Sequence, residues 1–188
     1  EFPLMLIGIT GALAIVPSLL LVWFFVSRDE HPEPSGVLWA TFWLGVLSIL
    51  PTLLVAFPAD MFMESVLTDT VALAASDAFV GAAFPEELFK LAVLVFYASR
   101  HRAFDEPMDG IVYGVVASLG FATFENLIYS AQGGVGVTIM RAFTAVPMHA
   151  FCGVVMGYYV GRARFPGEVP TTAPWLKAYL IPVVFHGV

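Results

Sequence analysis

The sequence predicts an all-α fold, a polytopic transmembrane helix bundle, and composition and segment length are the observations behind this prediction. Hydrophobic residues make up 59% of the 188 residues and charged residues only 12%, with a mean hydropathy of +0.86. A soluble domain usually needs about 25% charged residues to cover its water-facing surface. The composition therefore excludes a soluble domain and indicates a membrane protein.

Five apolar segments have the length of about 20 residues that a helix needs to cross the bilayer. They are residues 2–26, 36–57, 78–99, 109–131 and 137–161. A sixth begins near Pro174 and is cut off at Val188. The acidic stretch 59–77 is expected to form a loop with a short interfacial helix. The prediction is a single transmembrane domain, residues 1–188, with about six spans present.

The basic residues predict how the chain is oriented. Of the eight Lys and Arg residues, six lie in loops that alternating spans place on one side: Arg28, Arg100, Arg102, Arg162, Arg164 and Lys177. Cytoplasmic loops carry an excess of Lys and Arg. We therefore expect these loops to be cytoplasmic and the first residue to lie outside.

The segment 78–99 carries three charged residues, Glu86, Glu87 and Lys90. Ionisable groups at membrane depth cost several kcal/mol each unless paired or hydrated, so they usually mark function. Glu86 and Lys90 share a helix face, whereas Glu87 points about 100° away. Two adjacent carboxylates in a low dielectric cannot both ionise cheaply, which makes either glutamate a candidate general base. The alternative is two structural ion pairs, Glu86 with Lys90 and Glu87 with Arg141.

Segment 109–131 combines a close-packing face with a buried acid. Gly110, Gly114 and Ser118 recur every four residues, which lets another helix approach closely. Glu125 and Asn126 follow about two turns later. Helix packing explains the glycines but does not explain the carboxyl group of Glu125.

The last two segments contribute histidines. Three glycines continue from His149 at four-residue intervals, so His149 is expected on the close-packing face and not toward lipid. His186 lies in the final segment. A lone histidine in a helix is usually a satisfied core residue, but two histidines with three glutamates favour a shared site.

Depth within the membrane supports this shared site. At a rise of ~1.5 Å per residue, Glu86 and Glu125 lie roughly 9–13 Å from the outer ends of their segments, and His149 roughly 18 Å. The same rise places His186 roughly 13 Å below the outer surface. The predicted catalytic residues are Glu86, Glu87, Glu125, His149 and His186, supported by Lys90, Asn126 and Arg141.

Two mechanisms fit these residues. In the first, Glu86 or Glu87 activates a water while His149, His186 or Asn126 stabilises the oxyanion. In the second, Glu125, His149 and His186 supply two nitrogens and one oxygen to Zn²⁺ and leave a position for water. The His-Glu-x-x-His motif of zinc proteases is absent from the sequence. Cys152 is turned away from His149, so covalent catalysis is not expected.

These motifs together resemble the PrsW family of intramembrane proteases, which belongs to the same broad superfamily as the CAAX prenyl endopeptidases. The likeness covers nearly the whole chain. The matching elements are Glu-Glu-x-x-Lys from Glu86 to Lys90, Gly-Phe-Ala-x-x-Glu-Asn from Gly120 to Asn126, His149, His186-Gly187, and the loop Asp29-x-His31-x-Glu33-Pro34.

The resemblance implies a multi-pass enzyme of a prokaryotic cell membrane that cleaves single-pass membrane proteins, such as an anti-sigma factor. Its partners are then a transmembrane substrate and the lipid bilayer, with no nucleic acid. It also implies seven or eight spans, so the chain looks short at its carboxyl end. The cofactor stays unknown, because the motif leaves open whether the enzyme uses a metal such as Zn²⁺ or a glutamate-activated water.

Two other classes of membrane protein would also place polar groups at this depth. A proton- or ion-coupled transporter or channel does so along its pathway. A catalytically silent scaffold would use the same groups only to hold helices together. Transporters usually show internal repeats and broken helices in matching halves, and the sequence displays neither.

Overall fold

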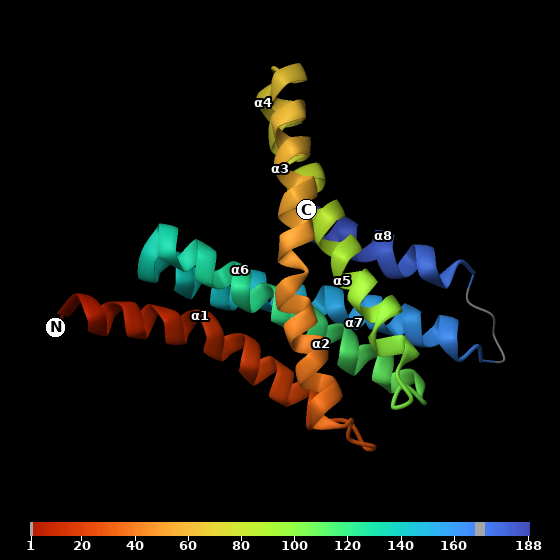
Figure 1. Cartoon of the computed structure of the whole chain (residues 1–188). Coiled ribbons are helices and arrows are strands. Elements are labelled where there is room, and N and C mark those ends of the chain that lie inside the picture. The colour runs from red at the N-terminus through yellow and green to blue at the C-terminus, as the bar shows by residue number, and fades with distance from the viewer. Residues whose placement is uncertain (1, 168–171) are drawn as a thin grey trace.

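The computed structural model describes residues 2–167 and 172–188, and all regular structure in these ranges is helical (Figure 1). The all-α prediction is therefore confirmed. The elements are α1 (Phe2–Val26), α2 (Ser35–Leu47), α3 (Ile49–Val66), α4 (Thr70–Ser76), the π-helix η1 (Asp77–Ala83), α5 (Phe84–Phe96), the 3₁₀ turn η2 (Ala98–Arg100), α6 (Pro107–Phe143), α7 (Ala145–Arg164) and α8 (Pro174–Gly187).

Three stretches within the described residues are long and apolar enough to cross a membrane: Gly8–Val26, Ser35–Val66 and Pro107–Arg164. The last of them contains two of the predicted spans, because the chain reverses within α6. Gly134 makes this reversal with a φ of 66°, a backbone conformation open to glycine because it lacks a Cβ. The total number of spans stays a prediction.

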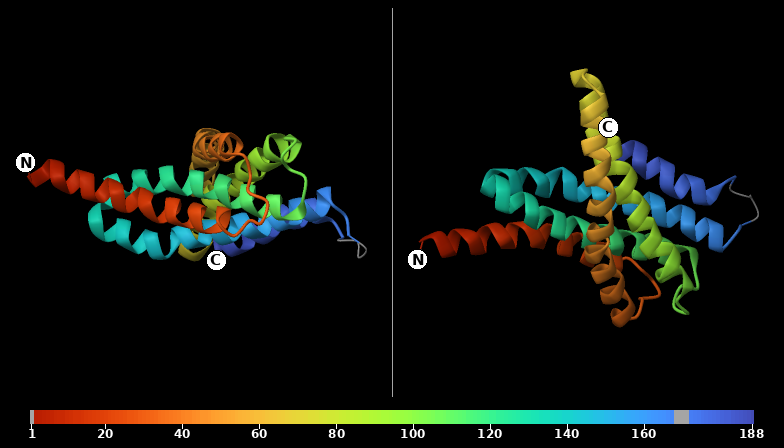
Figure 2. Two further views of the ribbon diagram at one scale, coloured as in Figure 1. Left: turned by 90° about the horizontal axis from the view of Figure 1, so that it is seen from below. Right: turned by 45° about the horizontal axis from the view of Figure 1, so that its top comes forward.

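Helices α6 and α7 form the centre of the molecule, with α1 beside α6 and α8 beside α7 (Figure 2). Helix α2 crosses α6 steeply. Helix α5 lies over the hairpin that α6 and α7 form, near α8. Most of α6 between Asp109 and Thr123 is buried. Large apolar side chains such as Leu54 and Phe57 point outward, 77% and 69% exposed, as expected of a surface that faces lipid.

The contact between α6 and α7 is a contact between backbones. A methyl group added at Gly157 would overlap the carbonyl oxygen of Gly110, and one added at Gly153 would lie 2.7 Å from the oxygen of Gly114. These are the glycines that the four-residue spacing singled out. Small residues at such positions let two membrane helices approach until their backbones touch.

The second helix is longer than predicted. It continues from α2 through Ser48 into α3 and ends at Val66, nine residues beyond the predicted end at 57. The prediction of a loop with a short interfacial helix over 59–77 is therefore wrong for 59–66, which belong to α3, whereas a short helix, α4, does lie in the rest of the stretch. Asp60 and Glu64 suggested a loop, but their neighbours Met61 and Phe62 are exposed apolar residues that keep the helix compatible with a lipid-facing surface.

A π-helix immediately precedes the glutamate pair. Pro85 lacks an amide hydrogen, and in an α-helix its ring would meet the carbonyl group of Gly81 four residues earlier. The wider turns of η1 end just before Pro85, where the amide of Phe84 bonds the carbonyl group of Phe79, five residues back. Single π segments often occur at functional sites, and this one leads directly into Glu86 and Glu87.

The close contact of α6 and α7 predicts a strong effect of a single methyl group. Gly157→Ala should lower the free energy of unfolding by about 1–3 kcal/mol through overpacking, which corresponds to roughly 3–9 °C in the midpoint of thermal unfolding. The matched control is Gly8→Ala on α1, where an added methyl group meets no described atom within 4 Å. Equal midpoints for the two purified variants in detergent would contradict the packing described for the hairpin.

Candidate active site

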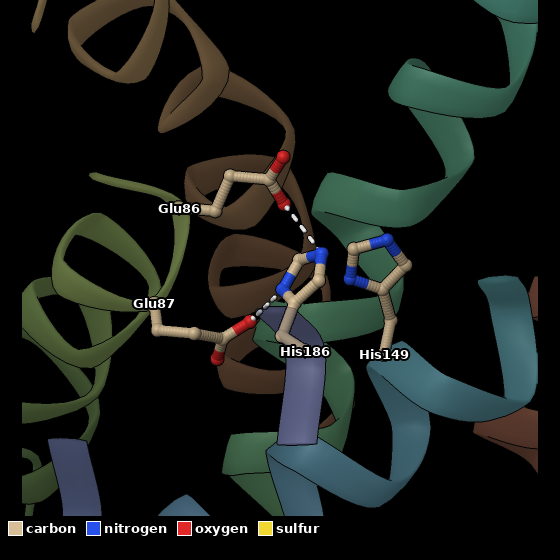
Figure 3. A group of neighbouring side chains, drawn as sticks. All are labelled: Glu86, Glu87, His149 and His186. Atoms are coloured by element: carbon tan, nitrogen blue, oxygen red, sulfur yellow. Dashed lines mark hydrogen bonds and ion pairs between the residues drawn. The ribbon is translucent and has the colours of Figure 1, made fainter. Parts of the chain in front are cut away.

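Four helices bring the predicted catalytic side chains together. Glu86 and Glu87 come from the first turn of α5, Glu125 from α6, His149 from α7 and His186 from α8. Figure 3 shows the carboxylates of Glu86 and Glu87 directed at the ring of His186, with the ring of His149 beside it. The two imidazole centroids are 5.0 Å apart.

Lys90 lies at the centre of this group and is fully buried. Its Nζ donates to Glu86 Oε2 at 3.1 Å and to Glu87 Oε1 at 3.0 Å, and lies 2.9 Å from His149 Nδ1. It also lies 4.2 Å from the ring centroid of Phe121, as in a cation–π contact. The ammonium group thus compensates both glutamates of its own helix.

His149 is held between Lys90 and Glu125. An ammonium group can only donate, so Nδ1 of His149 accepts from Lys90 and the ring hydrogen sits on Nε2. Nε2 lies 2.8 Å from Glu125 Oε2. The same carboxylate oxygen lies 2.7 Å from Arg141 Nη2, and Arg141 Nε donates to Asn126 Oδ1 at 2.7 Å. Arg141 therefore pairs with Glu125, and the ion pair with Glu87 that we considered from the sequence is not formed.

His186 links the two glutamates of α5 to α8. Its Nδ1 lies 2.7 Å from Glu87 Oε1 and its Nε2 lies 3.7 Å from Glu86 Oε2. Helix α8 also contacts the start of α5, because the hydroxyl of Tyr179 donates to the carbonyl oxygen of Phe84 at 3.0 Å. A methyl group added at Gly187 would meet the ring of Phe79, so the end of α8 fits closely against η1.

One group of donors in the site could hold a metal ion. Glu86, Glu87, His149 and His186 each offer one ligand atom, and these atoms all lie within 4.8 Å of one another. Carboxylate oxygens with imidazole nitrogens are typical zinc ligands. Glu87 also has a second buried oxygen, Oε2, without a hydrogen-bond partner among the described residues. These residues fit a divalent cation chemically.

Charge balance supports the same fit. Three carboxylates, of Glu86, Glu87 and Glu125, face two permanent cations, of Lys90 and Arg141. Three minus two leaves one negative charge uncompensated when both histidines are neutral. A buried uncompensated negative charge is costly and favours binding of a cation.

Glu125 lies outside the four-residue donor group, although one of the two mechanisms predicted from the sequence used it as a metal ligand. Its contacts are with the far nitrogen of His149 and with Arg141. That is the position of a carboxylate that orients a ligating histidine from behind. The ligand set therefore stays a prediction, with Glu87 geometrically better placed than Glu125.

Two cavities of about 290 Å³ each reach the site. The first lies between α3, η1 and α6 and is lined by Glu86 and Glu125 together with Leu53 and Asp60. The second lies between α6, α7 and α8, and its walls include Glu125, Arg141, Met148, His149 and His186. Glu87 lines neither cavity and is fully buried, so only Glu86 of the pair faces open space.

Sequence reasoning missed two residues of this neighbourhood. Phe121, which faces Lys90, is four residues before Glu125, and this spacing on one helix face was available as a signal. Asp60 borders the first cavity, but it lay in the stretch that we assigned to a loop.

Comparison with known proteins places these motifs in one family. A sequence model described as "PrsW family intramembrane metalloprotease" matches residues 33–188. A protein named Protease PrsW in Geobacillus kaustophilus is 38% identical over 93% of this chain and 75% of its own length. Proteins of the same name in Halalkalibacterium halodurans and Bacillus subtilis are 37% and 35% identical, over 92% of this chain and 78% and 77% of their own lengths. No solved structure matches the chain.

Proposed function

Because the chain belongs to the PrsW family of intramembrane metalloproteases, we propose that it hydrolyses peptide bonds of single-pass membrane proteins, anti-sigma factors among them. The observation that carries this proposal is the convergence of a buried histidine, a partly buried histidine and three carboxylates from four helices. A peptidase inside the membrane needs a base for water and an electrophile for the scissile carbonyl group, and this cluster supplies both.

Glu86 is the base in this proposal, because it is the glutamate of the pair that borders a cavity. Its carboxylate takes a proton from the attacking water and passes it to the nitrogen of the leaving amine. Glu87 is fully buried and contacts Lys90 and His186. A carboxylate in that position cannot contact a substrate, but it can orient His186 or bind a metal ion.

Glu87, His149 and His186 would hold the metal ion. One carboxylate and two imidazoles are the ligand set of zinc sites that keep a position open for catalysis. A bound Zn²⁺ supplies Lewis-acid polarisation of the scissile carbonyl group. Nε2 of His149 contacts Glu125, so Nδ1 would be the ligating atom, and it would have to give up its hydrogen bond from Lys90 to bind the ion.

Glu125, Lys90 and Arg141 are positioning residues. Glu125 fixes the tautomer and ring orientation of His149 through the bond to Nε2. Arg141 holds Glu125 in place and borders the second cavity. Lys90 keeps two adjacent carboxylates close together in a low dielectric, where they would otherwise repel each other.

The two cavities give a substrate chain access to the site. Both are lined by Glu125, the first adds Glu86, and the second adds His149 and His186. A helical substrate must unwind locally before hydrolysis, because its amides and carbonyl groups are bonded to one another. We infer that the unwound segment lies across Glu125 with one side in each cavity.

Substitution of the glutamate pair tests the base. In a bacterial membrane that contains doubly tagged single-pass proteins, an anti-sigma factor among them, Glu86→Gln should lower the cleavage rate ~10²-fold or more. Thermal stability should change little, because Glu87 still pairs with Lys90 and a neutral amide is cheaper to bury than a carboxylate. Glu64→Gln, an exposed acid of α3, is the matched control. Wild-type cleavage by Glu86→Gln would remove Glu86 from the mechanism.

Metal removal separates the metal from the base. Dialysis of the purified protein against a strong chelator should abolish cleavage, and Zn²⁺ should restore it. Glu86→Gln should retain bound zinc, whereas Glu87→Gln and His186→Gln should lose it, and Glu125→Gln should bind it ~10–100-fold more weakly. Zinc content by elemental analysis gives these values without a substrate. Full activity in the chelator would leave a glutamate-activated water as the mechanism.

The first cavity predicts a position-specific block of substrate binding. Leu53→Trp adds an aromatic ring at the cavity wall and should raise KM or abolish cleavage. Leu54→Trp makes the same change at the adjacent position, which is 77% exposed and does not line the cavity. Leu54→Trp should therefore cleave at the wild-type rate. Cleavage at the wild-type rate by both variants would show that the substrate enters by another route.

A further inference from the structure

A second cluster of buried acids lies far from the active site, at the start of α6. Asp29 and Glu33 come from the segment between α1 and α2, and Asp109 from the first turn of α6. One carboxylate oxygen of each lies within 4.8 Å of the other two. The residues are 7%, 8% and 0% exposed. Asp109 precedes Glu125 by sixteen positions, about 24 Å along a helix.

Two oxygens of this cluster are left without a partner. Asp109 Oδ2 accepts from the backbone amides of Asp105 at 2.7 Å and Glu106 at 2.8 Å, and Asp29 Oδ1 accepts from the amide of His31 at 3.1 Å. The opposite oxygens, Asp109 Oδ1 and Asp29 Oδ2, are buried and have no hydrogen-bond partner among the described residues. Buried unpaired oxygens are costly, so they point to a ligand.

The described hydrogen bonds to the three carboxylates come from uncharged donors. Glu33 accepts from the hydroxyl of Tyr113, and the two aspartates accept from backbone amides. Burial raises the pKa of Glu33 to about 7, and a side-chain hydrogen bond with Asp109 and the charges of Asp109 and Asp29 act in the same direction, despite the bond from Tyr113. The cluster therefore concentrates negative charge that these donors only partly compensate.

We propose that Asp29, Glu33 and Asp109 form a second cation site, which takes a hard divalent ion such as Mg²⁺ or Ca²⁺. The donors are oxygens alone, and such sets favour hard cations over Zn²⁺. A bound ion satisfies the two unpaired oxygens and joins the segment between α1 and α2 to the start of α6. Its role is structural, because it lies about 24 Å from Glu125.

The test is thermal unfolding of the full chain in detergent, first freed of metal and then titrated with Mg²⁺ or Ca²⁺. Millimolar cation should raise the unfolding midpoint of the wild-type protein by about 5 °C. Asp29→Asn keeps the acceptor for the His31 amide and turns the unpaired oxygen into an NH₂ group. The cation should therefore not raise the unfolding midpoint of this variant. Without cation the variant should be at least as stable as the wild type, because it removes repulsion between carboxylates.

A matched control assigns the response to this cluster. Glu87→Gln alters the active site and should still be stabilised by Mg²⁺ or Ca²⁺ as the wild type is. A rise of equal size in Asp29→Asn, or no rise in the wild type with either ion, would overturn the proposal. Stabilisation by acid alone, without a response to cations, would show instead that the three carboxylates share a proton.

Discussion

The backbone contact between α6 and α7 is the constraint on which the rest of the structure depends. Gly157 lies against Gly110 and Gly153 against Gly114, and larger side chains would force the helices apart. His149 is one turn before Gly153 on the same face of α7, and Glu125 lies three turns after Gly114 on α6. The register that the glycines impose thus brings His149 Nε2 to 2.8 Å from Glu125 Oε2.

Burial of charge then ties the remaining helices to this hairpin. Ionised groups removed from water must compensate one another. Lys90 of α5 does this for Glu86 and Glu87, and its third contact, with His149, fastens α5 to α7. His186 fastens α8 to α5 through Glu87. The same contacts that complete the fold therefore assemble the proposed catalytic group, and stability and activity depend on shared residues.

Helix α6 carries acids of two chemical kinds. Glu125 lies beside an imidazole and an arginine, in a site that combines nitrogen and oxygen donors. Asp109 lies sixteen positions earlier among oxygen donors alone. Since ligand type selects between borderline and hard cations, the middle and the start of α6 suit different ions. In our proposals, the middle supports hydrolysis and the start holds the connection of α1 to α2 in place.

The sequence by itself determined the fold class, the close-packing faces and the residues of the candidate site. Composition, apolar length and four-residue spacing are local properties, so they could be read before the structure was known. Only the tertiary structure decided which neighbour each charge meets. Glu86 and Glu87 are adjacent and chemically identical, yet Glu86 borders a cavity while Glu87 is enclosed by Lys90 and His186. Arg141 likewise pairs with Glu125. These choices depend on how helices distant in the chain pack against one another, and no local pattern encodes that.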